Sequence, residues 1–457
     1  MVAKMVAFPG RIGSLVRTAA GVSALAITGQ LTMVAAIPVL TRLYSPDDFG
    51  IFTIYLSIVN ILGSIAALRF GSSLYIVADR LHARVAIKLA LFAVCATTCI
   101  VLAAGYLLSG LAPEQLRHIA YLVPVGMIGV GFADVLNCWC LRFDHIREFG
   151  RGRLILPASM ALLQVGFGLV HLGGNAMIAA HILSQAVLIA YLGSRVLRWD
   201  DVRGIAQAPW QAVVSTARRE YKFPLFELPS ALAGFAIINL PAILIGSLFG
   251  TAFAGQFGVA ARLVTGPVSL IALPLSNVFV PEASKSHGPQ HLLRTAHGLL
   301  LVAAGLIVVP VLALGLVAPY LVVPILGQSW MPAGQIMTAL AFMGAAQALS
   351  TPVQEVPTLL RRQELRLVVD LARALLVFAP LLIGAHLGWN PLEVIYFMAA
   401  GGTIGFTLGI VAALLLLNGE AASERTRNNR TATLTDAFEG APSELSLPIV
   451  KNRRGRA

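Results

Sequence analysis

The sequence is poor in charged and in aromatic side chains. Of its 457 residues only 12% are charged and 8% are aromatic, whereas 57% are hydrophobic. The mean hydropathy is accordingly high, at +0.81. A water-soluble domain of this length needs far more polar surface than such a composition supplies. The shortage of charge therefore excludes an ordinary soluble protein and predicts that a lipid bilayer is the solvent.

Cysteine is equally scarce, and the few residues of this type form no recognisable site. They are spaced C-x3-C and C-x-C, with no histidine nearby, which is not the pattern of a zinc or disulfide framework. We predict buried free thiols at Cys95, Cys99, Cys138 and Cys140. Neither a metal site nor a cofactor is expected.

Long apolar runs are what the sequence has in abundance. About 20 consecutive apolar residues cross a bilayer as a helix, and the 42 glycines allow such helices to approach one another closely. We predict an all-α polytopic membrane protein with twelve transmembrane helices. Their approximate ranges are 19–40, 49–70, 86–108, 118–138, 154–172, 176–194, 224–248, 255–280, 298–323, 333–352, 367–387 and 392–417.

The distribution of basic residues orients these predicted spans. If both termini are cytoplasmic, 28 of the 33 Lys and Arg residues fall in inner segments, and only Arg42 and Arg117 fall in outer ones. Positive charge accumulates on the cytoplasmic side of membrane proteins. A missed or an extra span in the middle of the chain would destroy this asymmetry. The census therefore predicts twelve spans with both termini cytoplasmic.

The longest inner connection divides the predicted spans into six and six. We predict an N-lobe over 1–198, a cytoplasmic linker over 199–222, a C-lobe over 223–417 and a disordered, basic cytoplasmic tail over 418–457. Within the linker, "PWQAVVSTARREY" is typical of a helix that lies on the membrane surface.

The two halves share a sequence register. "LYSPDDFG" (43–50) reads as the outer turn of a helical hairpin in which Ser45 or Asp47 caps the second helix. Its counterpart lies 205 residues further on, where Gly50 pairs with Gly255 without a gap. An even number of spans separates the copies, so the predicted lobes are related by an axis along the membrane normal.

The two hairpins resemble a known family. "PVLTRLYSPDDFGIFTIYLSIVNILGSIAALRF" resembles the first hairpin of the bacterial polysaccharide flippases of the O-antigen (Wzx-like) type, and "YKFPLFELPSALAGFAIINLPAILIGSLFGTAFAGQFGVAARLVTGPVSLI" resembles the start of their second half. The likeness extends from about residue 10 to residue 417, and it is specific in the two hairpins. The family belongs to the superfamily that includes the MATE exporters and the lipid II flippases.

The resemblance implies the fold and a function. It implies a flippase that moves undecaprenyl-diphosphate-linked oligosaccharide repeat units across the bacterial inner membrane for exopolysaccharide or O-antigen-type biosynthesis. The partners implied are this lipid-linked oligosaccharide, membrane lipid, and a polysaccharide polymerase or chain-length regulator, and no nucleic acid is expected.

Arginines inside predicted spans are the first candidates for binding substrate. A charge at mid-bilayer costs about 2.5–3.5 kcal/mol and therefore normally faces a cavity or a partner, and guanidinium groups bind phosphate in a forked geometry. We expect Arg262 and Arg69 to line a central cationic cavity, with Arg373 and Arg42 as further candidates. Alternatively, Arg69 snorkels to the inner surface, and Arg373 forms a structural ion pair with Asp370.

Acidic residues in the spans are candidates for coupling transport to protons or Na⁺. These are Glu227, Glu355, Asp134 and Asp370, and the first two stand between prolines that loosen a helix. For Glu227 and Glu355 a polar helix end at the inner surface is the alternative. The sequence places His181 near the outer surface, where an isolated histidine is typical of the interface.

Two other classes of function compete with a flippase. The chain has no G-x-x-x-x-G-K-[ST] motif, which excludes nucleotide hydrolysis by that route, and its predicted outer loops are too short for a glycan polymerase or ligase. A MATE-type ion-coupled exporter of small molecules would share the fold. Its substrates are usually cations, so a cavity dominated by arginine would favour the flippase, and one dominated by carboxylates the exporter.

Overall fold

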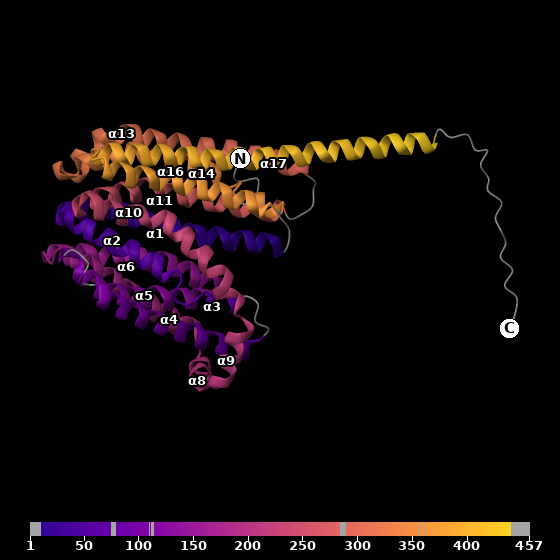
Figure 1. Cartoon of the computed structure of the whole chain (residues 1–457). Helices are drawn as coiled ribbons and strands as arrows, with labels where there is room; N and C mark the ends of the chain where they lie inside the picture. The colour runs from indigo at the N-terminus through magenta and orange to yellow at the C-terminus, as the bar shows by residue number, and fades with distance from the viewer. Residues whose placement is uncertain are drawn as a thin grey trace.

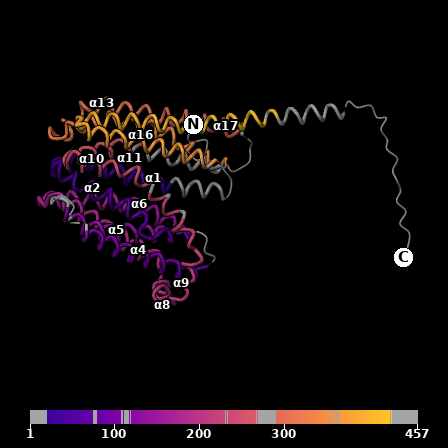
Figure 2. The backbone as a smooth tube through the Cα atoms, viewed as in Figure 1, coloured from indigo at the N-terminus to yellow at the C-terminus, as the bar shows by residue number. Residues whose placement is uncertain are grey.

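The computed structural model describes residues 11–74, 79–108, 110, 114–283, 289–354, 356–360 and 362–439 (Figure 1). Figure 2 traces the backbone in the same view. These residues form helices joined by short connections, and no strand occurs among them. The first half of the chain contains α1 (Arg11–Leu43), α2 (Pro46–Gly63), α3 (Phe70–Ser73), α4 (Arg80–Leu108), α5 (Glu114–Arg142), α6 (Ile146–Leu169) and α7 (Gly174–Val196).

The second half follows two short helices, α8 (Trp199–Gln207) and α9 (Trp210–Arg219). It contains the π-helical segment η4 (Phe223–Glu227), α10 (Leu228–Phe249), α11 (Thr251–Ala283), α12 (Pro289–Ala303), the π-helical segment η5 (Ala304–Val308), α13 (Val309–Leu326), the 3₁₀ turn η6 (Gln328–Trp330), α14 (Met331–Ser350), α15 (Val356–Leu359), α16 (Gln363–His386) and α17 (Pro391–Glu439).

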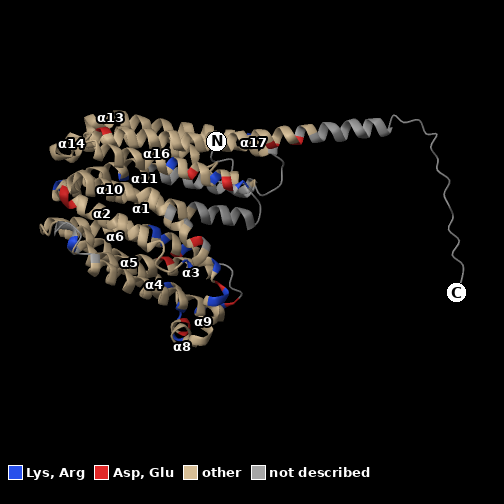
Figure 3. Ribbon diagram, viewed as in Figure 1, with Lys and Arg blue, Asp and Glu red and all other residues tan. Residues whose placement is uncertain are grey.

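The chain is an all-helical, multi-pass membrane protein. By length and hydropathy, eight helical segments of the described residues can cross a bilayer, and these lie in α1, α4, α5, α6, α7, α12–α13, α16 and α17. The other four predicted spans are also helical, in α2, α10, α11 and α14. Figure 3 shows charged residues mostly near the two ends of the bundle, with a largely uncharged band between them.

The helices pack in two groups that meet along α2. Helices α4 to α7 pack among themselves and α1 lies against α6, whereas α10, α11, α13, α14, α16 and α17 form the second group. Figure 1 shows the groups close together at the end where α1 meets α2, and diverging toward the end where α8 and α9 lie. Between the groups, α2 packs against α10 and α11.

Two glycines bring α2 and α11 into backbone contact at the convergent end. A Cβ atom on Gly50 would overlap the carbonyl oxygen of Thr251, and a Cβ atom on Gly255 would overlap the carbonyl oxygen of Pro46. In the 205-residue register Gly50 corresponds to Gly255, and Pro46 to Thr251. The contact is therefore reciprocal, as expected where two copies of one element meet at a pseudo-twofold axis.

The turn before α2 adds further contacts at the same end. The Ser45 hydroxyl accepts a hydrogen bond from the Asp48 amide, and the Asp48 carboxylate accepts one from the Ser45 amide, so Ser45 forms the predicted cap. The Thr251 hydroxyl donates to the Asp47 carboxylate at 2.5 Å. The fully buried Trp330 packs edge-on against Phe49, with ring centroids 5.0 Å apart. This end is therefore closed by packed side chains.

The second predicted span is broken, contrary to the continuous helix expected over 49–70. Helix α2 ends at Gly63 and α3 begins at Phe70, with Leu68 and Arg69 in the left-handed region at φ 47° and 59°. Each such non-glycine residue costs about 1–3 kcal/mol. Part of that cost is offset because the Thr97 hydroxyl donates to the Ala66 carbonyl at 2.7 Å, which satisfies a backbone acceptor freed by the break.

Two other expectations differ from the structure. Helix α17 continues to Glu439, whereas the sequence predicted disorder from residue 418. Extending an existing helix adds one hydrogen bond for each residue fixed, and 418–439 contains no proline to stop the extension. Residues 440–457 lie outside the described residues. The cysteines are free, but Cys95 and Cys99 are exposed on the outer face of α4 rather than buried.

Candidate functional site

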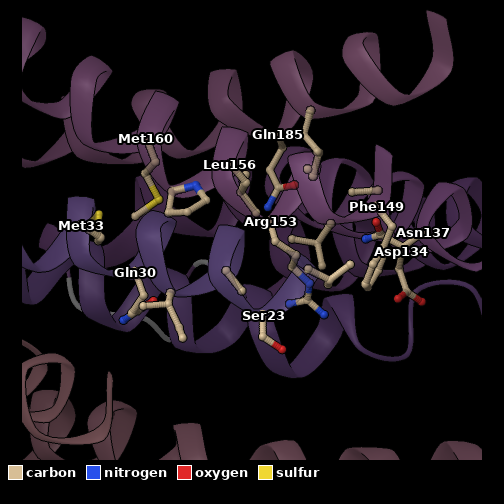
Figure 4. A pocket seen from close by; sticks show the side chains of 18 of the residues that line it. Ser23, Gln30, Met33, Asp134, Asn137, Phe149, Arg153, Leu156, Met160 and Gln185 are labelled. Carbon is tan, nitrogen blue, oxygen red and sulfur yellow. The ribbon is translucent and has the colours of Figure 1, made fainter. Parts of the chain in front are cut away.

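A cavity of about 730 Å³ opens inside the first group of helices. Its polar lining residues come from five helices, and the cavity reaches α11 of the second group through Arg262. Figure 4 shows Ser23, Arg153 and Gln185 near its middle and Asp134 with Asn137 to one side. The polar residues that line it are Ser23, Gln30, Asp134, Asn137, Arg153, Gln185 and Arg262.

Arg262 is held across the boundary between the two groups of helices. It belongs to α11, and its guanidinium carbon lies 4.9 Å from the ring centre of Phe52 on α2, a cation–π contact. Its Nη1 atom is buried and has no hydrogen-bond partner among the described residues. A buried guanidinium donor without a partner is costly, so this atom marks a place where a ligand or water with an acceptor oxygen belongs.

A buried histidine adjoins this arginine, whereas the sequence predicted an interfacial one. His181 on α7 is only 4% exposed, so it is not an interfacial residue. Its Nδ1 lies 3.2 Å from the Tyr55 hydroxyl and its Nε2 lies 3.3 Å from the Gln185 side-chain nitrogen. The Gln185 Oε1 is buried without a partner among the described residues, and Gln185 lines the cavity. The chain Tyr55–His181–Gln185 therefore ends in a buried, unpaired acceptor on a residue that lines the same cavity as Arg262.

Two cations and one carboxylate determine the charge of the cavity. Arg153 lies in α6, where it also packs over the Phe149 ring at 5.2 Å. Asp134 on α5 is close enough to Arg153 and Arg69 to interact with both charges. Because Arg153 and Arg262 outnumber Asp134, the lining carries net positive charge. A cavity of this sign attracts anions.

Arg69 does not line this cavity. Its Nε lies 3.5 Å from Oε2 of Glu227, the last residue of the π-helical segment η4. The pair thus joins the break after α2 to the start of the second group, and brings one cationic and one acidic candidate together outside the cavity. Snorkelling alone does not describe this position.

The remaining candidates lie apart from the cavity lining. Arg373 forms an ion pair with Asp370 at 2.5 Å and packs over the Phe406 ring at 4.7 Å. Arg42 is exposed at the end of α1. Glu355 lies outside the described residues.

Sequence reasoning missed Arg153, because the predicted span began at residue 154. Helix α6 begins at Ile146 instead, which moves Arg153 two turns into the helix. One signal was available: "IREFGRGRLIL" contains small residues at Gly150 and Gly152, and both are buried against neighbouring helices. Glycine lets membrane helices approach closely, so these two glycines indicate that the packed part of the helix extends beyond its apolar run.

The fold is shared with solved membrane transporters. The lipid II flippase MurJ in an inward closed conformation superposes with a TM-score of 0.61, at 9% identity, over 88% of this chain and 90% of that one. An inward-facing multidrug resistance MATE family transporter gives 0.58, at 15% identity, over 87% and 94%. The Vibrio cholerae MATE transporter VcmN gives 0.56, at 16% identity, over 90% and 98%. These likenesses show that the chain has a MATE-like fold.

The sequence comparisons identify the family within that fold. The polysaccharide biosynthesis protein family matches residues 39–335, and the chain belongs to this family. The teichuronic acid biosynthesis protein TuaB of Bacillus subtilis is 25% identical over 245 residues. That match covers 53% of this chain, and it spans only 50% of the length of this relative.

Proposed function

We propose that this chain is a flippase of the bacterial inner membrane that moves undecaprenyl-diphosphate-linked oligosaccharide repeat units from the cytoplasmic to the periplasmic leaflet. Membership of the polysaccharide biosynthesis family and the likeness to the flippase fold support this class. The moved glycans would serve exopolysaccharide or O-antigen-type biosynthesis, with a polymerase or chain-length regulator downstream.

The topology that we propose has twelve spans and both termini in the cytoplasm. The helical segments over all twelve apolar runs and the 28 inner basic residues support it. The N-lobe (1–198) and the C-lobe (223–417) would rock against each other about the contact between α2 and α11, joined by the linker 199–222. In this topology the closed end with Gly50 and Gly255 is periplasmic, and the divergent end faces the cytoplasm.

The observation that carries the proposal is the buried, unpartnered Nη1 of Arg262 in a cavity of net positive charge. A diphosphate supplies acceptor oxygens and the opposite charge, and Arg153 offers a second guanidinium for the second phosphate. The side chains of Asn137 and Gln185 supply amide groups suited to sugar hydroxyls. The cavity therefore combines groups for both parts of such a substrate.

Alternating access needs the cytoplasmic end to open and close as well. The ion pair between Arg69 and Glu227 spans the two lobes at that end. We propose that it is an inner latch, which strengthens as the lobes approach there. In this role Glu227 acts through charge pairing with Arg69, and coupling to H⁺ or Na⁺ is assigned to Asp134, the one carboxylate among the residues that line the cavity.

Binding of a water-soluble, short-chain prenyl diphosphate to the purified protein tests the proposal. A hydrogen bond to a charged group contributes about 1.5–3 kcal/mol, so Arg262→Ala should weaken binding by roughly 10- to 150-fold. Arg262→Ala should also abolish glycan export in cells at normal protein level. The matched control is Arg147→Ala, which removes an exposed arginine before the cavity-lining part of α6. Binding and export at control levels in Arg262→Ala would refute the assignment.

The alternative, an ion-coupled exporter of organic cations, has one observation in its favour. Asp134 lines the cavity and could hold a cation. If that were the function, Asp134→Asn would abolish binding of an aromatic cation such as ethidium, and Arg262→Ala would strengthen it by removing like charge. The net positive lining argues for the flippase.

A further inference from the structure

The linker helix α8 is held on α4 by ion pairs to one buried carboxylate. Asp201 on α8 is 0% exposed, and its carboxylate accepts hydrogen bonds from Arg80 at 2.7 and 3.0 Å and from Arg84 at 2.9 and 3.1 Å. Forked arginine–carboxylate bonds are directional and hold both partners in one orientation. Arg80 and Arg84, which the charge census counted as loop cations, therefore serve to position α8.

A third cation of the same α4 face sets the position of α9. Lys88 donates to the carbonyl oxygens of Ala206 and Ala208 at 2.9 and 2.6 Å, and its Nζ lies 4.9 Å from the ring centre of Trp210. The Trp210 ring in turn packs edge-on against Phe92, with centroids 5.1 Å apart. Both ends of the short connection between α8 and α9 are thereby held on α4.

The contact with Phe92 places α9 at the level of the membrane interface. Phe92 is 52% exposed on α4, a helix apolar and long enough to cross the bilayer. An exposed phenylalanine on such a helix faces acyl chains. Trp210, packed beside it and 53% exposed itself, takes the position that tryptophan favours at the boundary between acyl chains and headgroups.

One stripe of α9 runs from this apolar contact to a cation. Trp210, Val214 and Arg218 follow one another at intervals of four residues and share one helix face. With Gln211 and Ser215 they line a surface groove of about 420 Å³. Arg218 is exposed and makes no ion pair within the described part of the chain. The nearby carboxylate of Glu220 pairs instead with Arg219 at 2.8 Å.

We propose that this groove binds an anionic phospholipid of the inner leaflet. One acyl chain lies against Phe92 and Trp210, and the phosphate group lies at Arg218. The charge of the groove is complementary to a leaflet rich in anionic lipid. The site is separate from the transport cavity, because none of its residues lines that cavity. It holds α9, and with it the linker, at the bilayer surface.

Fluorescence quenching by brominated lipids tests this site in the intact protein. The protein is reconstituted into equimolar vesicles of phosphatidylcholine and phosphatidylglycerol, with bromine on the acyl chains of one lipid or the other. The Trp210 signal is the emission that Trp210→Phe removes. One arginine near an anionic surface corresponds to about fivefold enrichment, so brominated phosphatidylglycerol should quench Trp210 about fivefold more efficiently than brominated phosphatidylcholine.

The variants separate charge recognition from apolar contact. Arg218→Gln should bring the ratio of quenching efficiencies close to one while Trp210 is still quenched, and the control Arg147→Gln should leave the ratio unchanged. The proposal is overturned if Trp210→Phe leaves the quenched emission at the wild-type level, because Trp210 then does not touch acyl chains. It is overturned equally if the two lipids quench Trp210 alike in the wild type, or if Arg218→Gln keeps the preference.

Discussion

Replacing Gly255 by alanine should loosen the closed end of the molecule. The added Cβ would overlap the carbonyl oxygen of Pro46 and would lie 2.7 Å from the amide nitrogen of Gly50. Both atoms are backbone of α2, so no side-chain rotation relieves the clash. Separation of α2 from α11 relieves it completely. The substitution therefore penalises the closed state and spares a state in which these two helices have parted.

The size of the effect follows from the cost of overpacking. Forcing an extra methyl group into a well-packed contact costs about 1–3 kcal/mol, which corresponds to about a five- to 150-fold shift toward the open state. Alanine also favours a helix over glycine by about 0.8–1.0 kcal/mol. That gain applies to α11 in both states, so it cancels from the conformational equilibrium while it raises overall stability.

A reporter cysteine at Thr53 measures this opening. Thr53 is 6% exposed and lies on the seam, where a Cβ on Gly258 would overlap its side chain. Its hydroxyl has no hydrogen-bond partner among the described residues, so Thr53→Cys removes no bond. In a background without the native cysteines, Gly255→Ala should raise labelling by a membrane-impermeant maleimide within the range given above. Gly234→Ala is the control, because its Cβ would meet open space. Equal labelling rates in both variants would refute the inference that Gly255 holds α11 against α2.

Three further predictions concern the ends of the molecule. Under the proposed function, Glu227→Arg and Arg69→Glu should each impair transport, and the double variant should recover part of it. Two independent losses that add would contradict the proposed latch. Burial opposes ionisation of Asp201, but the hydrogen bonds from the two arginines of α4 outweigh it and lower its pKa. Ionised Asp201 therefore stabilises the linker above the ordinary carboxyl pKa, and this stabilisation is lost as the pH falls through the lowered pKa. Below about pH 4 protease cleavage of the linker should accelerate. Asp201→Asn should make the cleavage rate independent of pH in this range. Ser45→Ala should cost about 1 kcal/mol in thermal unfolding in detergent, and an unchanged transition would contradict the capping role.

The fold was largely predictable because the bilayer imposes a simple rule on the sequence. Apolar runs predict helices where the structure has them, although the second run is broken after Gly63. The register of 205 residues pairs Gly50 with Gly255, and both glycines lie in the contact between α2 and α11. Local breaks were not predictable in this way. "AALRFGSSLYIV" is apolar on both sides of Arg69, and the break there is hydrogen-bonded by the Thr97 hydroxyl of another helix, at the Ala66 carbonyl. A local sequence pattern does not reveal a hydrogen-bond partner on another helix.

The candidate site was predictable only where a charge interrupted an apolar run. Arg262 met that criterion and lines the cavity. Arg153 stands at the edge of an apolar run, a position typical of a loop cation. The partner that marks His181 as a buried residue is Tyr55, 126 residues away in the sequence. Pairing also changed the meaning of other charges, since Asp370 neutralises Arg373 within its own helix. Sequence spacing suggests the pair Arg373–Asp370. Only the packed structure shows that Arg153 lines a cavity with Arg262 and that His181 has a partner in Tyr55.

Under the proposed function, the position of Arg262 links substrate binding to the closed contact between α2 and α11. It is the cavity-lining residue contributed by α11, and its guanidinium rests on Phe52 of α2, a few residues past the Gly50 contact. Because Arg262 lies on α11 and Arg153 on α6, opening between α2 and α11 should change their spacing and weaken a diphosphate bound by both. Ligand binding and closure are then coupled: closure strengthens binding by the same free energy by which binding stabilises the closed state. Under the proposed function, Gly255→Ala should weaken prenyl diphosphate binding by the factor by which it depopulates the closed state. A variant that opened the seam without loss of affinity would separate the two events.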